Sequence, residues 1–244
     1  MTVRRRTIGI VLGVLVIVLI LAAWGATHVI VSTGLLRKWV NTDPEKFFID
    51  YEAASGWVPG VVRIRGLTVR GSDSNVQWHA RMERATLSIS LLDLMRKEFH
   101  ARQVRAEGLV FRLRQKVGKA EISQAHEKRL PEIPGFSSPP WKVAEPEPRP
   151  LTPKEKRRFW TIRIDDFAAD PVPEIWIEIY RFRGHARVTG GFGLRPHHYA
   201  SIGPAAVEFV TGRFELAPSE IILASASGRA DCTFDTFSPD EVRG

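Results

Sequence analysis

The chain has 244 residues, of which 44% are hydrophobic and 25% charged, and its formal net charge is +8. This is the balance of a folded globular protein, and the length suits one large domain or two small ones. Cys232 is the only cysteine in the sequence, so an intramolecular disulfide is excluded.

The first predicted element is an uncharged apolar segment from Ile8 to Val31. About 20 apolar residues in a helix cross a hydrocarbon core roughly 30 Å thick. The segment follows Arg4–Arg6, and only Arg37 and Lys38 lie at a similar distance behind it. This bias favours a cytoplasmic N-terminus and a body beyond the membrane. A cleaved signal peptide is the alternative, since Ala23–Gly25 has a small-x-small form, but the length of the apolar run favours a retained anchor.

The excess positive charge would suit nucleic acid, but a body across the membrane rarely meets it. The anionic headgroups of phospholipid or glycolipid are therefore the expected partners of this charge. Neither a nucleic-acid partner nor a cofactor is expected.

Residues Leu35 to Tyr51 have the apolar spacing of two short amphipathic helices. Asp43–Glu45 has the form of an N-cap, a proline at the first helical position and an acidic first turn. Trp39 and the pair Phe47–Phe48 suit either the membrane interface or docking onto the following sheet.

From Trp57 the apolar period changes to two, which predicts strands. A slip at Gly66 suggests a bulge, residues 71–75 form a turn cluster, and Leu91 to Lys97 predicts a single helical turn. The strand after that turn loses its phase near Gln103. The apolar positions of this half are Val62, Ile64, Leu67, Val69, Val76, Trp78, Ala80, Ala85, Leu87, Ile89, Phe99, Ala101, Leu109, Phe111 and Leu113. We predict a meander of short antiparallel strands with one polar and one apolar face.

Residues Lys116 to Arg158 interrupt this pattern. Prolines recur from Pro131 to Pro153, and proline neither donates to a strand ladder nor suits a helix interior. We therefore predict an exposed, partly extended loop or linker outside the sheet. The flanking strands, Leu109–Arg114 and Trp160–Phe167, are expected to lie close together. A short Gly/Ser linker in place of Val117 to Lys156 is expected to leave the rest folded.

The period of two resumes after the loop. Turn signals fall at Gly184, Gly203–Pro204, Gly212 and Pro218–Ser219. The apolar positions are Trp160, Ile162, Ile164, Ile175, Ile177, Ile179, Ala186, Val188, Phe192, Val207, Phe209, Phe214, Leu216, Ile221, Leu223, Ala230, Cys232 and Phe234. About ten strands share this pattern, with no long helix to cover their apolar face. The sheet must therefore fold on itself, pair with more sheet, or hold an apolar ligand.

Catalytic and metal-binding motifs are weak. The chain has no glycine-rich phosphate loop and no Gly-x-Ser-x-Gly nucleophile motif. Adjacent strand residues point to opposite faces, so His197–His198 are expected to be a surface pair, and Asp165–Asp166 to be separated and solvated. His79, His100 and His185 show no spacing of a triad. We expect no enzyme activity, no catalytic residue and no metal site.

Three stretches resemble the N-terminal portion of AsmA-like and TamB-like envelope proteins, which are chorein-type, bridge-like lipid-transfer proteins. These stretches are Gly60–Val69, Ala85–Leu94 and Val104–Leu113, and they follow a single N-terminal anchor. In that family a strand pair is followed by a small helix and another strand. The resemblance covers about Leu35 to Arg114 and, more loosely, Trp160 to Asp235.

The resemblance implies a mainly β fold, in which an N-terminal transmembrane helix precedes a curved, groove-like antiparallel sheet with short helices. It also implies a single-pass protein of the bacterial inner membrane, with a cytoplasmic N-terminus and a periplasmic body. The apolar groove would carry phospholipid acyl chains between the inner and outer membranes. Partners would then be phospholipid or glycolipid, the inner membrane, and other envelope proteins or further copies. The chain departs from the family in being short and in its proline-rich interruption. About ten strands at roughly 4.8 Å each span at most about 50 Å, so the chain is expected to be a fragment, a subunit of a longer assembly, or not a full bridge.

The expected organisation has four parts: a cytoplasmic tip and transmembrane signal-anchor at 1–34, a first part of the sheet with short amphipathic helices at 35–115, a proline-rich charged loop at 116–158, and a continuation of the sheet at 159–244. The predicted groove-lining residues are Ile64, Val69, Leu87, Ile89, Phe111, Leu113, Ile162, Ile164, Ile175, Ile177, Ile179, Val188, Phe209, Phe214, Cys232 and Phe234.

Two alternatives remain. A structural or docking protein of the envelope would pack its sheet as a β-sandwich and recruit partners through edge strands or the proline loop. A membrane-anchored hydrolase would use His197, His198 or Asp165.

Overall fold

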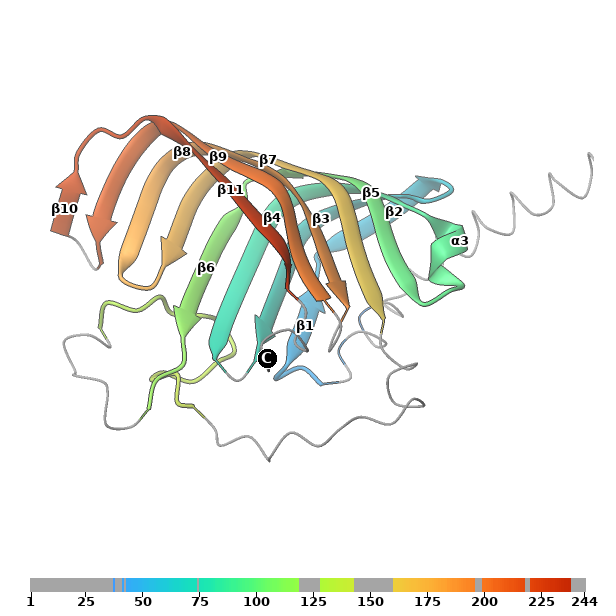
Figure 1. The fold of residues 1–244 in the computed structure, drawn as a ribbon, viewed down its shortest axis with the longest axis horizontal. Coiled ribbons are helices and arrows are strands. Elements are labelled where there is room, and N and C mark those ends of the chain that lie inside the picture. The colour runs from blue at the N-terminus through green and yellow to red at the C-terminus, as the bar shows by residue number, and fades with distance from the viewer. Residues whose placement is uncertain are drawn as a thin grey trace, which may run out of the picture.

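The computed structural model describes residues 37, 41, 43–73, 75–118, 128–142, 160–195, 199–217 and 220–237. These residues confirm a mainly β fold, because they form one 11-stranded sheet and a single short helix, α3 (Figure 1). The predicted anchor at 8–31 lies outside the described residues. No helix of the described part is both long and apolar enough to cross a membrane.

The strands lie in the order β1-β3-β4-β5-β7-β8-β9-β10, with β2 beside β3, β6 between β4 and β7, and β11 beside β9. Their bounds are β1 Phe47–Asp50, β2 Ala53–Val58, β3 Val61–Ser72, β4 Val76–Ile89, β5 Glu98–Glu107, β6 Val110–Gln115, β7 Thr161–Ile177, β8 Tyr180–Arg195, β9 Tyr199–Leu216, β10 Glu220–Leu223 and β11 Gly228–Phe237, with α3 at Leu91–Leu94. Figure 1 shows these strands side by side in one sheet, curving along their length.

The sheet is mixed, so the prediction of a wholly antiparallel sheet is wrong. Both β5 and β6 run parallel to β7, with Glu98 opposite Thr161 and Leu113 opposite Ile177. Antiparallel neighbours need only a hairpin, whereas parallel neighbours need a long crossover connection. The stretch between β6 and β7 is that crossover, which is why the chain interrupts its strand pattern there.

The predicted neighbourhood of 109–114 and 160–167 is also wrong, because β6 pairs with the far end of β7, at Glu174–Ile177. The start of β7 pairs with β5 instead. From Ile177 back to Thr161 the strand covers 16 residue steps, or about 53 Å at roughly 3.3 Å each. A linker that replaces the crossover must therefore run back along β7, a requirement that the expectation from the sequence did not include.

Two glycines with left-handed backbone mark a line across the middle of the strands. Gly66 has φ 64° and Gly108 has φ 66°. A Cβ on Gly108 would lie 2.6 Å from the Glu83 side chain, and one on Gly66 would lie 2.5 Å from that of Glu52. The slip predicted at Gly66 is therefore a change of backbone conformation. It is not a bulge against β4, because Arg65 pairs with Arg84 and Leu67 with Met82 in one register.

The same line continues through the second half of the sheet. The N–H of Gly108 donates to the carbonyl of Pro171 at 3.0 Å. Register shifts follow in β7 between Ala169 and Val172, and in β8 at His185–Ala186. Irregularities aligned on successive strands bend the whole sheet rather than one strand.

The predicted helix over 43–51 is wrong. Asp43 O accepts hydrogen bonds from the N–H groups of Lys46 and Phe47, which makes a single turn before β1 begins. The backbone of β1 then pairs with β3, and the side-chain amide of Asn41 bonds both the N–H and the carbonyl of Ile49 at 2.8 and 2.9 Å. Tertiary pairing thus overrides the local helix signal.

The predicted turns have mixed outcomes. The turn after β3 and the single turn of α3 are confirmed, and the lost phase near Gln103 is confirmed as a register shift against β4. The turns at Gly184, Gly203–Pro204 and Gly212 are wrong, because all three sites lie inside β8 or β9. Gly184 lies opposite Gly212, and a Cβ at Gly184 would meet Thr211 O at 2.2 Å. These two glycines permit close approach of two strands and do not end them.

Candidate functional site

One face of the sheet, here called the apolar face, carries uninterrupted rows of apolar residues. The pairing register places the members of each row opposite one another on successive strands. The first row is Ile64, Ala85, Ala106, Ala169, Val188, Val207 and Ala230. The second row, beyond the bend, is Ile49, Val69, Ala80, Phe111, Ile175, Phe182, Phe214 and Leu223.

Most predicted lining residues share this face. Those that the strand register or core packing places on it are Ile64, Val69, Leu87, Ile89, Phe111, Leu113, Ile162, Ile164, Ile175, Ile177, Val188, Phe209 and Phe214. Ile179 is an exception, because it lies in the turn between β7 and β8. Cys232 has the register of this face but is exposed on the edge strand β11. The side chain of Phe234 lies outside the described part.

Several members of the face were missed in the sequence. Phe182 is 1% exposed and sits at the centre of a ring cluster with Phe209 and Phe214, at centroid distances of 4.7 and 5.2 Å. The expected turn at Gly184 hid it, although the alternation Phe182, Gly184, Ala186 continues without a break. Ala106 and Ala169 of the first row were also missed, because small residues carry little periodic signal.

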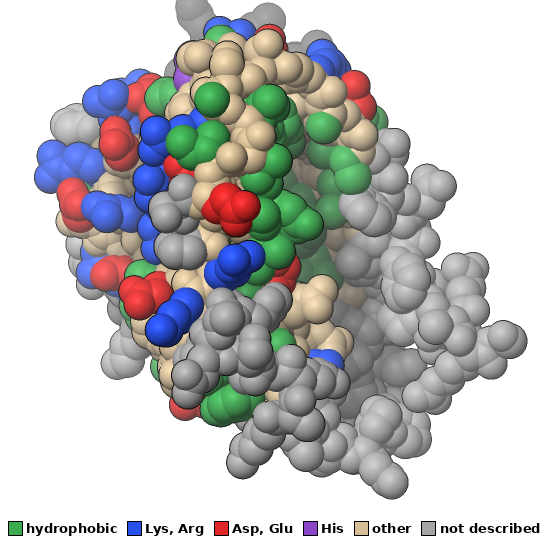
Figure 2. Space-filling view, turned by 90° about the vertical axis from the view of Figure 1, so that its left-hand side faces the viewer, with side chains coloured by type: hydrophobic (Ala, Val, Ile, Leu, Met, Phe, Trp, Pro, Cys, Tyr) green, Lys and Arg blue, Asp and Glu red, His purple; other side chains and the backbone are tan. Residues whose placement is uncertain are grey.

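The apolar face is closed in its middle and open toward the strand ends. Val172 and Ala186 are 0% exposed, so the face packs against itself at the bend. Toward the strand ends Ile177 is 42% exposed, and Phe192 and Ile202 are each 37% exposed. Figure 2 shows a band of hydrophobic side chains down the middle of the molecule, with charged side chains gathered to one side of it.

The opposite face, here called the charged face, alternates arginine with aromatic and acidic residues. One row across it reads Arg70, His79, Arg112, Trp176, Arg181 and Glu215. Arg112 and Arg181 both donate from Nε to the carboxylate of Glu174, at 2.9 and 3.0 Å. Burial works against ionisation of Glu174, but the hydrogen bonds and charges of these two arginines hold its pKa below the ordinary value. The Trp176 ring lies near both guanidiniums, 5.7 and 4.3 Å from its centroid.

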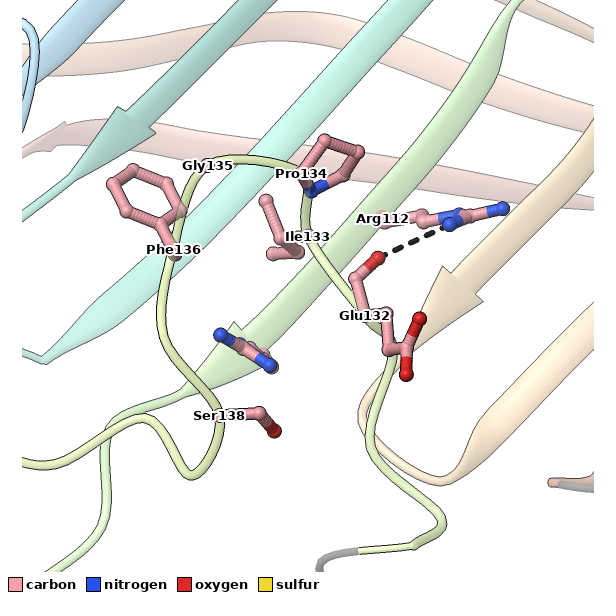
Figure 3. Close-up of a pocket in the computed structure, with 8 residues that line it drawn as sticks. Arg112, Glu132, Ile133, Pro134, Gly135, Phe136 and Ser138 are labelled. Carbon is pink, nitrogen blue, oxygen red and sulfur yellow. Dashed lines mark hydrogen bonds between the residues drawn. The ribbon is translucent and has the colours of Figure 1, made fainter.

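Part of the crossover packs on this face, which corrects the prediction of an exposed loop for residues 128–142. Leu130 and Ile133 are only 5% and 3% exposed. Beneath them Arg114 is 1% exposed and donates to Pro131 O and Ser137 O at 3.1 and 2.7 Å. Proline keeps this segment out of the ladder, as predicted, but its carbonyls are free to receive arginine donors. Figure 3 shows the segment looping over β6, with Arg112 reaching the Glu132 carbonyl.

Two pockets flank this segment on the charged face. The first, of about 340 Å³, lies under residues 132–138 and includes Arg112 and Arg114 (Figure 3). The second, of about 600 Å³, is shared between the segment and β1, β3 and β4, and it also includes Arg112. Neither pocket lies on the predicted groove. The alternating arginines at 112 and 114 were the sequence signal for these pockets, but the sequence pattern assigned them only to the polar face of a strand.

His79 borders the second pocket. This residue is 5% exposed, and its Nδ1 has no hydrogen-bond partner among the described residues. Burial, followed by the charges of Arg112, Arg70 and Arg81, lowers the pKa of His79 to about 4. The ring is therefore neutral at pH 7 and lies in a positive potential.

Asp165, the candidate catalytic residue that the structure describes, is engaged in structural contacts. A register shift after Ile164 brings both Asp165 and Asp166 to side chains of β5, so the expected separation to opposite faces is wrong. Asp165 Oδ2 lies 2.7 Å from Nε2 of His100, whereas Asp166 pairs with Arg105. Nδ1 of His100 lies 2.8 Å from Asp93, which leaves neither ring nitrogen for acid–base work.

The remaining histidines add no metal cluster. His185 pairs with Asp170, and the residues 197–198 lie outside the described part. In the part of the chain that the structure describes, no three histidine, cysteine or carboxylate side chains come together to hold a metal.

Comparison with known proteins gives no family. No family model matches the chain. No curated protein matches it either. The resemblance to AsmA-like and TamB-like proteins therefore stays a prediction.

Proposed function

We propose that this chain is a membrane-anchored, non-enzymatic lipid-handling protein whose apolar face receives the acyl chains of phospholipid. The observation that carries the proposal is the pair of apolar rows that together cross all described strands except β2, with large side chains left partly exposed toward the strand ends. Monomeric proteins seldom leave a continuous apolar surface without a partner.

The energetics of such a surface favour acyl chains. Each methylene removed from water contributes about 0.8 kcal/mol, and the interaction needs no specific geometry. A ligand held in this way can shift along the rows in small steps. The closed middle of the face limits the accessible parts to the strand ends, so we propose that a chain binds beside Ile177 and Tyr180 or beside Phe192 and Ile202.

Placement at a membrane supports the same proposal. The uncharged segment from Ile8 to Val31 would hold the sheet at a bilayer, and the arginines before it would keep the N-terminus cytoplasmic. In a bacterium the body would then lie in the periplasm. A reporter that is active only in an oxidising compartment, fused after Gly244, should be active and membrane-bound.

A photocrosslinking pair tests lipid contact. A benzophenone side chain at Ile177 or Phe192 should capture phospholipid in cells, because both positions lie on the open parts of the apolar face. The matched control is Thr189, which lies three residues before Phe192 on β8, is exposed and belongs to the charged face. Capture of lipid at Phe192 but not at Thr189 supports the proposal. Equal capture at both, or capture of protein alone at Ile177 and Phe192, rejects it.

A docking protein of the envelope is the second candidate. The β-sandwich form is not observed, because the described strands make one sheet. One observation still favours docking: the edge strand β10 exposes Ile221, Ile222 and Leu223 to between 49% and 55%. An exposed apolar edge is a template for strand addition. Ile222→Lys should abolish partner capture or self-association while leaving lipid crosslinking at Phe192 intact.

A further inference from the structure

The pocket of about 600 Å³ on the charged face has an unusual lining. Its floor and walls include Thr68, His79, Arg81 and Arg112 from β3, β4 and β6, and Pro134 of the crossover closes one side. It lies on the opposite face of the sheet from the apolar rows. Whatever occupies it is therefore independent of the acyl-chain proposal.

The strand register brings four polar side chains together in this pocket. Thr68 lies directly opposite Arg81, and His79 lies directly opposite Arg112. His79 and Arg81 are two residues apart on β4, so they share a face. Arg81 and Arg112 are then diagonal neighbours, with separations of roughly 7–8 Å, within reach of one small ligand for long side chains.

Two members of this group, Arg81 and His79, have polar atoms without an internal partner. Arg112 donates from Nε to Glu174 and from Nη1 to the Glu132 carbonyl, so only its Nη2 is left without a partner among the described residues. Arg81 is exposed and makes no ion pair or hydrogen bond among the described residues. His79 Nδ1 is buried and also has no partner there. A buried polar atom without a hydrogen bond destabilises the fold, and a ligand that bonds the atom removes this cost.

The carboxylates around the pocket are already paired with arginines, and Glu174 opposes Arg112 and Arg181. Arg81 is therefore the lining arginine that has no acidic partner among the described residues. Asp50 pairs with Arg37 at 3.2 Å, and Glu52 pairs with Arg65 at 3.5 Å. Each acid is thus already opposed by its own arginine. The depressed pKa of His79, caused by burial and then by nearby arginines, reports the same positive potential from inside the pocket.

We propose that this pocket binds an ionised phosphate group of an organic ligand, with Arg81 and Arg112 as charged donors and His79 and Thr68 as neutral partners. Donors that approach from three strands suit a tetrahedral anion with several oxygens better than a planar carboxylate. The volume exceeds that of one phosphate, so room remains for the group that carries it. Two sources share this chemistry: a small soluble phosphomonoester and a phospholipid headgroup.

The test uses the full chain in detergent micelles, with two arms of titration calorimetry. One arm adds glycerol 3-phosphate with inorganic phosphate as reference, and the other adds dihexanoyl phosphatidic acid with dihexanoyl phosphatidylcholine as reference. Arg81→Gln removes the unpaired donor. The matched control is Arg63→Gln, since Arg63 is an exposed arginine of the same face outside the pocket.

Arg81→Gln should weaken binding about tenfold or more in the arm that binds, while Arg63→Gln changes it by less than about twofold. Binding in the first arm identifies a soluble phosphate as the ligand, and binding in the second arm alone identifies a headgroup. The His79 ring resonances should shift on titration, which a distant surface effect would not produce. No saturable binding in either arm, or equal losses in the two variants, overturns the proposal.

Discussion

Arg114 provides the sharpest test of how the crossover is held. This residue is 1% exposed, and it donates to Gln77 Oε1, Pro131 O and Ser137 O at 3.0, 3.1 and 2.7 Å. Burial lowers the pKa of its guanidinium, so the charge is held at a desolvation cost. Arg114→Met keeps the apolar stem of the side chain, ends near the position of Nε, and removes every donor.

The size of the effect follows from three opposing contributions. Hydrogen bonds from a charged donor stabilise by about 1.5–3 kcal/mol each, so three bonds give an upper bound of about 5–9 kcal/mol. Methionine offsets several kcal/mol of this, because no charge then needs to be desolvated. Ser137 is exposed, so water replaces one lost donor. We expect a net loss of about 3 kcal/mol in docking of residues 128–142 onto β6.

Hydrogen exchange measures that docking locally. Amides of residues 128–142 should exchange on the order of 100-fold faster in Arg114→Met, and trypsin should cut earlier at Arg129. The control is Arg84→Met, which removes an exposed arginine whose side chain is 71% accessible and pairs with Glu107. An exposed pair contributes about 0.2–1 kcal/mol, and residues 128–142 should not respond to its loss. Identical exchange in the two variants would refute the buried-arginine clamp.

Three further predictions follow from the bend, the crossover and the His100 cluster. Hydrogen bonds to Asp165 and then to Asp93 raise the pKa of His100. The stability that this residue contributes to the fold is therefore complete below the unfolded pKa of about 6.5 and is lost as the pH rises through the folded pKa. Hydrogen exchange of the α3 amides should become faster over that pH range in the native protein but not in His100→Gln. Gly108→Ala should lower the free energy of unfolding in urea by more than about 1 kcal/mol, because the φ of this residue is 66°. Gly203→Ala should lower it by less, because a Cβ at this position would make only ordinary contacts. The reverse order would contradict the role of Gly108 in the bend of the sheet. Replacing Val117–Lys156 with about 2 Gly/Ser residues should prevent folding, while about 24 should permit it, because the connection must run back along β7, whose 16 residue steps follow a path of about 53 Å. Circular dichroism of both variants decides.

The two-residue period of the chain determined the fold class and most of one face. Alternation of side chains belongs to a strand itself and needs no knowledge of its neighbours. Ile64, Phe111 and Val188 were therefore assigned to a common apolar face before any pairing was known, and the register confirms it. Phe182 was not assigned to this face, because Gly184 was taken for a turn between two strands.

What the sequence could not supply is everything that depends on distant partners. The parallel pairing of β6 with β7 joins residues more than 60 positions apart, and no local pattern encodes it. The register shift that brings Asp165 and Asp166 to the same neighbouring strand exists only against β8.

The charged face shows the same limit most clearly. By itself, the sequence determined that arginines alternate along β6, as Arg112 and Arg114 do. Only the tertiary structure decided that Arg114 is buried beneath the crossover while Arg112 borders two pockets. The physical reason is that burial and potential are sums over neighbours in space, whereas periodicity is a property of neighbours in the chain.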